Sequence, residues 1–346
     1  MTASADRPLV SIVIPTRNRR ESLSDAIESL LAQRLQGELD VVVVDNACDD
    51  GTAEMIQTRF PQIRHIRQPV MVGAQQNMMA ALRAGTGRYV GMLFDDEVML
   101  HDNLWRKIEI LEQHSGVVGV ASSVTKREVD GSVSPGRALR SQCVIEGRVE
   151  YLTNSLGTFT AELSTLVMRT DAVGEMQMRP QDQPIDDSPF FYRLSKLGSI
   201  ATIPDGLVTH TTSAVGQMYG ECVLEPVQPH DRRRPPLGLP TVWFYWSYRR
   251  VSLDHLAESD DLSKVVVGRL RRKAQAKWRS GVWKAAYCRL LVTRRPGPSF
   301  EVMLQAFALD PFVIVPPVVS LVRKQSGLRR APIAPFVSTS QQERTA

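Results

Sequence analysis

The sequence predicts an α/β fold with a mostly parallel sheet flanked by helices, and two patterns carry the prediction. Residues 9–14 and 39–44 are apolar, β-branched runs, as expected for strands that are covered on both faces. Between them, apolar residues recur at the spacing of one buried helical face: Leu23, Ala26, Ile27, Leu30 and Leu31. Strands that alternate with helices at this spacing predict βαβ units and a parallel sheet.

The same alternation continues along the first half of the chain. Further strands are expected at 63–67, 89–94 and 117–124, and further helices from Thr52, over 74–83 and after Asp102. From 127 to 157 the pattern weakens toward loops or short antiparallel strands. A helix is expected at 187–197 and a strand at 199–203.

The rest of the chain has a different character. Residues 217–240 are rich in proline and arginine and predict a linker. Two helices, over about 241–257 and 262–292, follow within a basic helical extension at 241–330. We expect the tail at 331–346 to be disordered.

Charge is distributed unevenly along the 346 residues. The net charge of +5 combines −8 over residues 1–230 with +13 over 231–330, which suggests that the two parts meet different partners. The four cysteines are scattered, as in a cytosolic protein with reduced thiols. The N-terminus lacks a leader pattern, and no window approaches the roughly 20 apolar residues of a membrane-spanning helix. We therefore expect a cytoplasmic protein, either free or peripheral at the inner face of the plasma membrane.

Polar residues follow three of the expected strands at the point where each strand ends. Pro15, Thr16 and Arg17 follow the first strand, Asp45 ends the second, and the run 95–97 (Asp-Asp-Glu) follows the strand at 89–94. In open parallel sheets, ligands bind beyond the carboxyl ends of the strands. The sequence therefore predicts a ligand site at this edge.

Three stretches resemble the nucleotide-binding half of the family 2 glycosyltransferases: VSIVIPTRNRRESLSDAIESLLAQ, VVVVDNACDDGT and AGTGRYVGMLFDDE. A looser resemblance covers PIDDSPFFYRLSKLGSIATIPDGLVTH, on the acceptor side. The resemblance implies a Rossmann-like GT-A catalytic domain at 1–216, with a nucleotide-sugar-binding half at 1–110 and an acceptor half at 111–216. It also implies inverting transfer of one sugar from a UDP-, dTDP- or GDP-linked donor, in polysaccharide or glycoconjugate biosynthesis.

The resemblance assigns the donor site to a defined set of residues. Asp45 would accept the N–H of the base; the alternative is an Asx-turn carboxylate that bonds its own loop. The remaining nucleotide contacts would come from Pro15, Thr16, Arg17 and Asp95, and the donor-sugar contacts from Gly73, Asn77 and Asp96. Arg17 could instead be a solvated surface charge. Gln76 stands where the family usually has an arginine.

The acidic run predicts a divalent cation. Adjacent carboxylates repel one another, and a hard cation such as Mg²⁺ or Mn²⁺ offsets that repulsion. The resemblance implies Asp95, Glu97 and His210 as metal ligands, with Glu97 in place of the second aspartate of the family's Asp-x-Asp pattern. The alternatives are a solvated acidic turn and, for His210, a structural hydrogen-bond donor.

Catalysis is expected from Asp187, with Asp186 positioning it. The resemblance implies that Asp187 removes the proton of the acceptor hydroxyl. The two carboxylates could instead cap the helix that follows.

Residues 264–295 interleave lysine and arginine with aromatic residues, which is typical of a surface that binds anionic lipid. A nucleic-acid surface lacks a supporting motif, and a solvated helix packed on the catalytic domain is as consistent with the pattern. The acceptor is expected to be a glycan, a lipid-linked sugar or a small molecule. Two other functions fit parts of the pattern: a non-catalytic nucleotide-sugar-binding protein, and a sugar-nucleotide pyrophosphorylase, which would need a glycine-rich loop after the first strand.

Overall fold

A ten-stranded sheet forms the centre of the protein in the computed structural model, which describes residues 7–127, 132–135, 140, 142–156, 161–182, 187–211 and 240–293. The main strand order is β3-β2-β1-β4-β9-β6-β10-β5, and β7 and β8 pair with β6 and β10. The strands are β1 (Val10–Thr16), β2 (Leu39–Asp45), β3 (Arg64–Arg67), β4 (Tyr89–Met92), β5 (Glu97–Met99), β6 (Val117–Arg127), β7 (Val133–Pro135), β8 (Val144–Glu146), β9 (Val167–Arg169) and β10 (Ser199–Thr211). Strands β1 to β4 pair in parallel, as do β6 and β10. The other five pairings of this sheet are antiparallel, so the α/β fold is confirmed and its central sheet is mixed.

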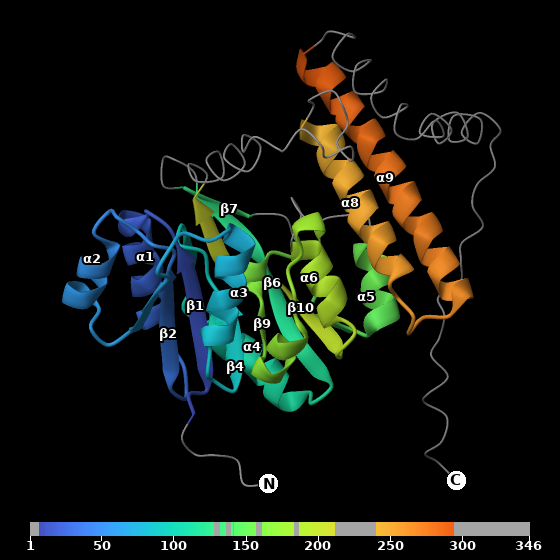
Figure 1. Cartoon of the computed structure of the whole chain (residues 1–346). Helices are drawn as coiled ribbons and strands as arrows, with labels where there is room; N and C mark the ends of the chain where they lie inside the picture. The colour runs from blue at the N-terminus through green and yellow to red at the C-terminus, as the bar shows by residue number, and fades with distance from the viewer. Residues whose placement is uncertain are drawn as a thin grey trace, which may run out of the picture. The chain divides into compact units, whose positions relative to one another are not determined.

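Helices cover both faces of this sheet (Figure 1). The helices are α1 (Arg20–Leu31), α2 (Thr52–Arg59), α3 (Ala74–Ala84), α4 (Asn103–Gln113), α5 (Arg148–Ser155), α6 (Asp187–Leu194), α8 (Pro240–Ala257) and α9 (Lys264–Thr293), with short 3₁₀ turns η1 (Leu163–Thr165), η2 (Thr170–Glu175) and η3 (Pro180–Asp182). Successive side chains of β1 enter different cores. Ile12 and Ile14 pack with α1, α2 and α4, and Val13 packs with α3, α5 and α6.

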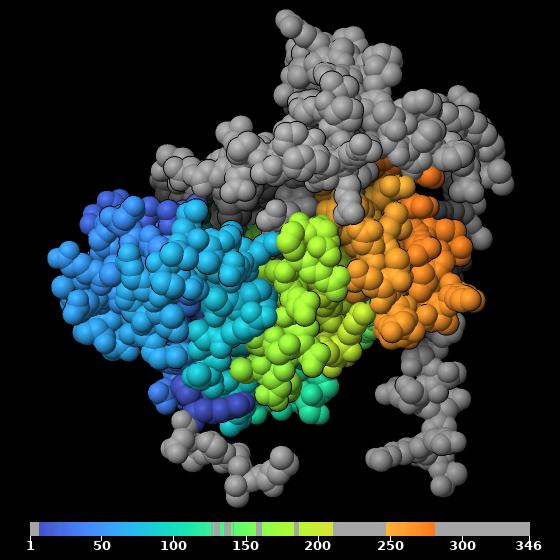
Figure 2. Space-filling model, viewed as in Figure 1, coloured from blue at the N-terminus to red at the C-terminus, as the bar shows by residue number. Residues whose placement is uncertain are grey.

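Helix α8 and the first part of α9 pack onto the α6 side of the sheet. Leu256, Leu270 and Ala274 belong to the same buried cluster as the side chains of α6, and Trp278 is fully buried. The described residues up to Gly281 accordingly form one compact unit. In the space-filling view, α6 lies between the surface of the first hundred residues and that of α8 (Figure 2). Pro240, the last residue of the linker expected at 217–240, begins α8. The rest of that linker and the tail at 331–346 lie outside the described residues.

Two elements differ from the sequence prediction. Strand β10 continues past the expected end at Ile203, because register shifts on either side of Gly206 accommodate Pro204 and Asp205 without ending the pairing to β6. Helix α5 forms where loops or strands were expected; a helix of eight residues shows too few periods for its apolar face to be distinguished. Among the described residues, no helix has both the length and the apolar character that crossing a membrane requires.

Candidate active site

The carboxyl ends of β1 and β4 are joined by a hydrogen-bonded carboxylate network. Thr16 Oγ1 donates to Asp95 Oδ2 at 2.7 Å. Arg19 Nη1 donates to Asp95 Oδ1 at 3.1 Å and to Asp96 Oδ2 at 2.7 Å, so one guanidinium bridges both carboxylates. We name Thr16, Arg19, Asp95 and Asp96 the donor edge. Arg19 was not singled out in the sequence, although the basic run directly after the first strand was the available signal.

Asp95 is the most electrostatically unusual group of the donor edge. It is only 6% exposed, and this burial raises its pKa to about 6, while Arg19 and the Thr16 hydrogen bond act in the opposite direction. The neighbouring Asp96 charge raises it further. Positive charge next to Asp95 therefore stabilises its ionised form.

Glu97 begins β5 and is 1% exposed. Its Oε1 accepts from Ser164 Oγ at 3.1 Å, and its Oε2 accepts from the Phe94 amide at 3.3 Å. The antiparallel register of β5 and β10 places residue 210 directly opposite residue 97. This burial does not agree with a solvated acidic turn.

The donor edge suits a hard divalent cation in its chemistry. Its candidate ligands are carboxylate oxygens, which Mg²⁺ and Mn²⁺ prefer, and Asp96 is the more exposed of its two carboxylates. Within the described residues, no three acidic, histidine or cysteine side chains lie close enough together to enclose an ion. The positive charge beside Asp95 and Asp96 comes from Arg19.

Asp45 is fully buried at the end of β2. Its Oδ1 accepts from the Cys48 amide at 2.6 Å, which is the Asx turn that the sequence left as an alternative. Its Oδ2 lies 3.1 Å from Arg67 Nη1 and 3.3 Å from His65 Nε2, two residues of β3 that the sequence did not indicate. The carboxylate is thus held in place from two strands.

The loops beside Asp45 are fixed by further polar contacts. Arg17 Nη1 donates to the Asn46 carbonyl at 2.7 Å, so it is more than a solvated surface charge. The Asn46 side chain bonds both the amide and the carbonyl of Val72, at 2.8 and 2.9 Å. These contacts tie the end of β2 to the segment that precedes α3.

Two of the residues expected at the donor sugar differ in how far they are buried. Gly73 is exposed at the N-cap of α3, with open space around the position of a Cβ atom. Asn77 is buried, and its Nδ2 donates to the Val44 carbonyl at 3.3 Å, so its amide faces the sheet. Pro15 is likewise buried in β1, paired with Val44.

Asp187 is the half-buried first residue of α6. Only four residues separate the end of α6 from the start of β10, which runs parallel to β6. The N-terminus of α6 therefore points toward the carboxyl edge of the parallel strands, where the donor edge lies (Figure 1). Asp186 and the side chain of His210 are outside the described residues.

Residues 11–163 match the profile of glycosyl transferase family 2. The chain resembles the family 2 glycosyltransferases. It is 32% identical over 102 residues to abequosyltransferase RfbV of Salmonella typhimurium, covering 28% of this chain and 30% of that protein. It is 29% identical over 116 residues to the putative teichuronic acid biosynthesis glycosyltransferase TuaG of Bacillus subtilis, covering 32% and 44%.

The matched segments thus span less than half the length of these relatives. Among solved structures, S. aureus TarS 1-349 in complex with UDP-GlcNAc aligns with a TM-score of 0.58 at 12% identity, covering 93% of each chain. This likeness shows the fold, which is of the GT-A type.

Proposed function

We propose that this protein transfers one sugar from a nucleotide diphosphate sugar to an acceptor hydroxyl, with inversion at the anomeric carbon. The observation that carries the proposal is the donor edge, which joins Thr16, Arg19, Asp95 and Asp96 inside the segment that matches the family. The division of residues 1–216 into a donor half and an acceptor half belongs to the same proposal.

The donor is bound along the carboxyl ends of β1, β2 and β4. Asp45, oriented by Cys48 and Arg67, accepts a hydrogen bond from the base, for which Arg67 releases one carboxylate oxygen. Thr16 and Arg17 approach the nucleotide, and Pro15, paired with Val44 within β1, fixes the backbone directly before them. Gly73 provides the open backbone beside the sugar.

Mg²⁺ or Mn²⁺ would be held by Asp95 and Glu97 together with His210, which lies opposite Glu97 in the sheet and whose side chain is outside the described residues. When bound, such an ion neutralises charge on the departing diphosphate. Arg19 supplies positive charge at the same place from the protein itself. The bond between Ser164 and Glu97 keeps the Glu97 carboxylate oriented.

Asp187 removes the proton of the acceptor hydroxyl. The hydroxyl oxygen then attacks the anomeric carbon, and the bond to the diphosphate breaks on the opposite side, so the diphosphate leaves with the electron pair. The inward side chains Phe190 and Phe191 are fully buried and hold α6 in a fixed orientation. A single displacement of this kind inverts the configuration.

The first half of α9 gives the protein a cationic surface for an anionic membrane. Lys264, Arg269, Arg271 and Arg272 are exposed, and the helix has no acidic residue over 264–281. Leu270, Ala274 and Trp278 face the protein core, as the packed-helix alternative requires, so lipid attraction at this part of α9 is electrostatic.

Calorimetric titration with UDP, GDP and dTDP, with and without Mn²⁺, tests the donor site. We expect one nucleotide to bind, and Asp95→Asn to weaken its binding about tenfold or more, since a charge-assisted contact is lost. Asp102→Asn is the matched control, because Asp102 is exposed and its side chain does not cap α4. Absence of binding for all three nucleotides in both conditions would contradict the proposal.

A further inference from the structure

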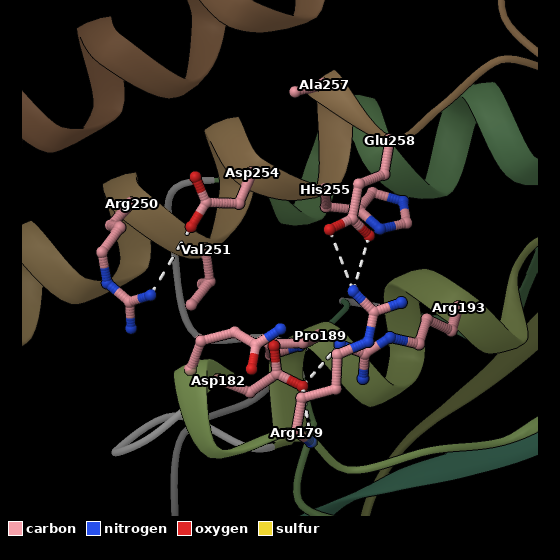
Figure 3. A pocket seen from close by; sticks show the side chains of 11 residues that line it. Arg179, Asp182, Pro189, Arg193, Arg250, Val251, Asp254, His255, Ala257 and Glu258 are labelled. Carbon is pink, nitrogen blue, oxygen red and sulfur yellow. Dashed lines mark hydrogen bonds and ion pairs between the residues drawn. The ribbon is translucent and has the colours of Figure 1, made fainter.

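A cavity of about 570 Å³ lies between α8 on one side and η3 and α6 on the other. This volume falls inside the range of about 300–1,000 Å³ that is usual for small-molecule sites. Figure 3 shows the side chains of α8 pointing across the cavity toward those of η3 and α6. None of the residues that line it belongs to the donor edge.

The walls of the cavity are charged but balanced. Three arginines and three carboxylates line it, and each arginine is paired with a carboxylate of the same cavity. The pairs are Arg179 with Glu258 at 2.8 Å, Arg193 with Asp182 at 2.5 Å and Arg250 with Asp254 at 3.5 Å. A phosphate or another anion would therefore have to displace a carboxylate that is already in place.

The floor of the cavity is also neutral. His255 is 6% exposed and lies against the Tyr192 ring, with 5.3 Å between the ring centroids. Burial lowers its pKa to about 3, and the surrounding cations Arg148, Lys196, Arg193 and Arg179 lower it further, so the imidazole is uncharged near neutral pH. Its Nε2 is buried without a hydrogen-bond partner in the part of the chain that the structure describes.

Two of the carboxylates are readily available to a ligand. The side chains of Glu258 and Asp254 are 49% and 57% exposed. Exposed ion pairs contribute only about 0–1 kcal/mol, so a ligand can compete for their oxygens and N–H groups. A ligand hydroxyl both donates to a carboxylate and accepts from a guanidinium, whereas a charged group satisfies only one of the two.

The cavity is also well placed for an acceptor. Pro189, two residues after Asp187, lines it, and Gln75 of α3 donates to the Arg179 carbonyl at 3.0 Å. Its rim thus connects α6, which carries the proposed base, to the helix that follows Gly73. Building on the proposed function, we infer that the cavity binds an uncharged saccharide portion of the glycosyl acceptor.

The test measures the binding of the full-length protein to a panel of immobilised neutral and acidic oligosaccharides. We expect neutral oligosaccharides to bind, and Glu258→Gln and Asp254→Asn each to weaken that binding about tenfold. Asp260→Asn, which removes the same charge just beyond the end of α8 but outside the cavity, should bind like the wild type. Melting temperatures of all four proteins should agree closely, because the substituted side chains are exposed.

Release of nucleoside diphosphate from donors in water, without any acceptor, is measured on the same proteins. It should be equal in the wild type and in the cavity variants, since the donor edge is untouched. Preference for acidic oligosaccharides, or neutral binding that survives both cavity variants, would overturn the saccharide site. A different result would be that no donor is hydrolysed, while neutral oligosaccharides still bind and the cavity variants weaken that binding. This result would count against the proposed transfer reaction but would support the saccharide site.

Discussion

The donor edge and the cavity beside α8 are built in different ways. The donor edge gathers Thr16, Asp95 and Asp96 from the ends of neighbouring strands, and its hydrogen bonds are buried or partly buried. The cavity joins η3 and α6 to α8, and its carboxylates Asp254, on α8, and Glu258, directly after α8, are about half exposed. Parallel strands bring their ends together wherever the sheet forms, whereas the cavity exists only because α8 docks on α6. The first arrangement is rigid, and the second can exchange internal pairs for ligand contacts.

The largest effect is expected at the junction of these two regions. Asp187→Asn should lower kcat by a factor of about 10²–10⁴, because the amide cannot accept the acceptor's proton at neutral pH. Donor Kd should change little, since the donor is bound along β1, β2 and β4. If Asp187 only capped α6, asparagine would substitute well and kcat would stay near normal.

Asp186→Asn is measured in parallel. We expect a smaller loss of kcat than at position 187. A large loss of kcat in Asp186→Asn with normal kcat in Asp187→Asn would identify Asp186 as the base instead.

A second test concerns the metal at the donor edge. Glu97→Ala should remove most of the activity, and excess EDTA should do the same in the wild type. The substitution also frees Ser164, so Glu97→Gln, which retains an oxygen that can accept from Ser164, separates metal binding from local packing. Full turnover in excess EDTA would show that the charge of Arg19 suffices without an ion.

A third test concerns the buried lysine of α4. Lys107 is fully buried on α4, donates to the Thr165 carbonyl, and burial lowers its pKa to about 7. The unfolded lysine keeps its proton up to about pH 10.5, so the unfolded chain binds more protons above pH 7 and stability rises with pH. Between about pH 6.5 and 8.5 the expected gain is on the order of 2 kcal/mol.

Lys107→Met should abolish this gain in denaturant unfolding, and it should raise stability most at the lower pH. All other titrating groups are present in both the wild type and Lys107→Met. The difference between the two proteins' free energies of unfolding, measured against pH, therefore reports on Lys107 alone. Parallel profiles would show that Lys107 stays protonated inside the fold.

The smallest effect is expected on α9. Co-sedimentation with vesicles that contain anionic lipid should weaken by about fivefold in Arg271→Gln, since one basic residue near a charged surface contributes about 1 kcal/mol. Binding should also weaken as salt is added. Arg83→Gln, on the exposed last turn of α3, is the control. Equal binding to neutral and anionic vesicles would remove the electrostatic membrane role.

The sequence was informative where a residue's role depends on its position after a strand. Thr16, Asp45 and Asp95 could be placed at one edge because buried parallel strands have a strong pattern. The orientation of Asn77 could not be predicted: its position in the chain matches the donor loop, and helical phase turns its amide to Val44. Arg19 and Arg67 escaped notice because the sequence pattern does not reveal which exposed arginine pairs with a buried carboxylate. The cavity beside α8 could not be predicted from the sequence, because its walls form only when α8 docks on α6.

The most direct test of the central claim is turnover by the purified full-length chain. Wild-type protein is incubated with UDP-, GDP- and dTDP-sugars and Mn²⁺, and the released nucleoside diphosphate is quantified beside Asp95→Asn and Asp102→Asn. We predict release from at least one donor by the wild type and by Asp102→Asn, and strongly reduced release by Asp95→Asn. Nucleotide binding without release from any donor, with or without a panel of sugar acceptors, would contradict the assignment and identify a nucleotide-sugar-binding protein instead.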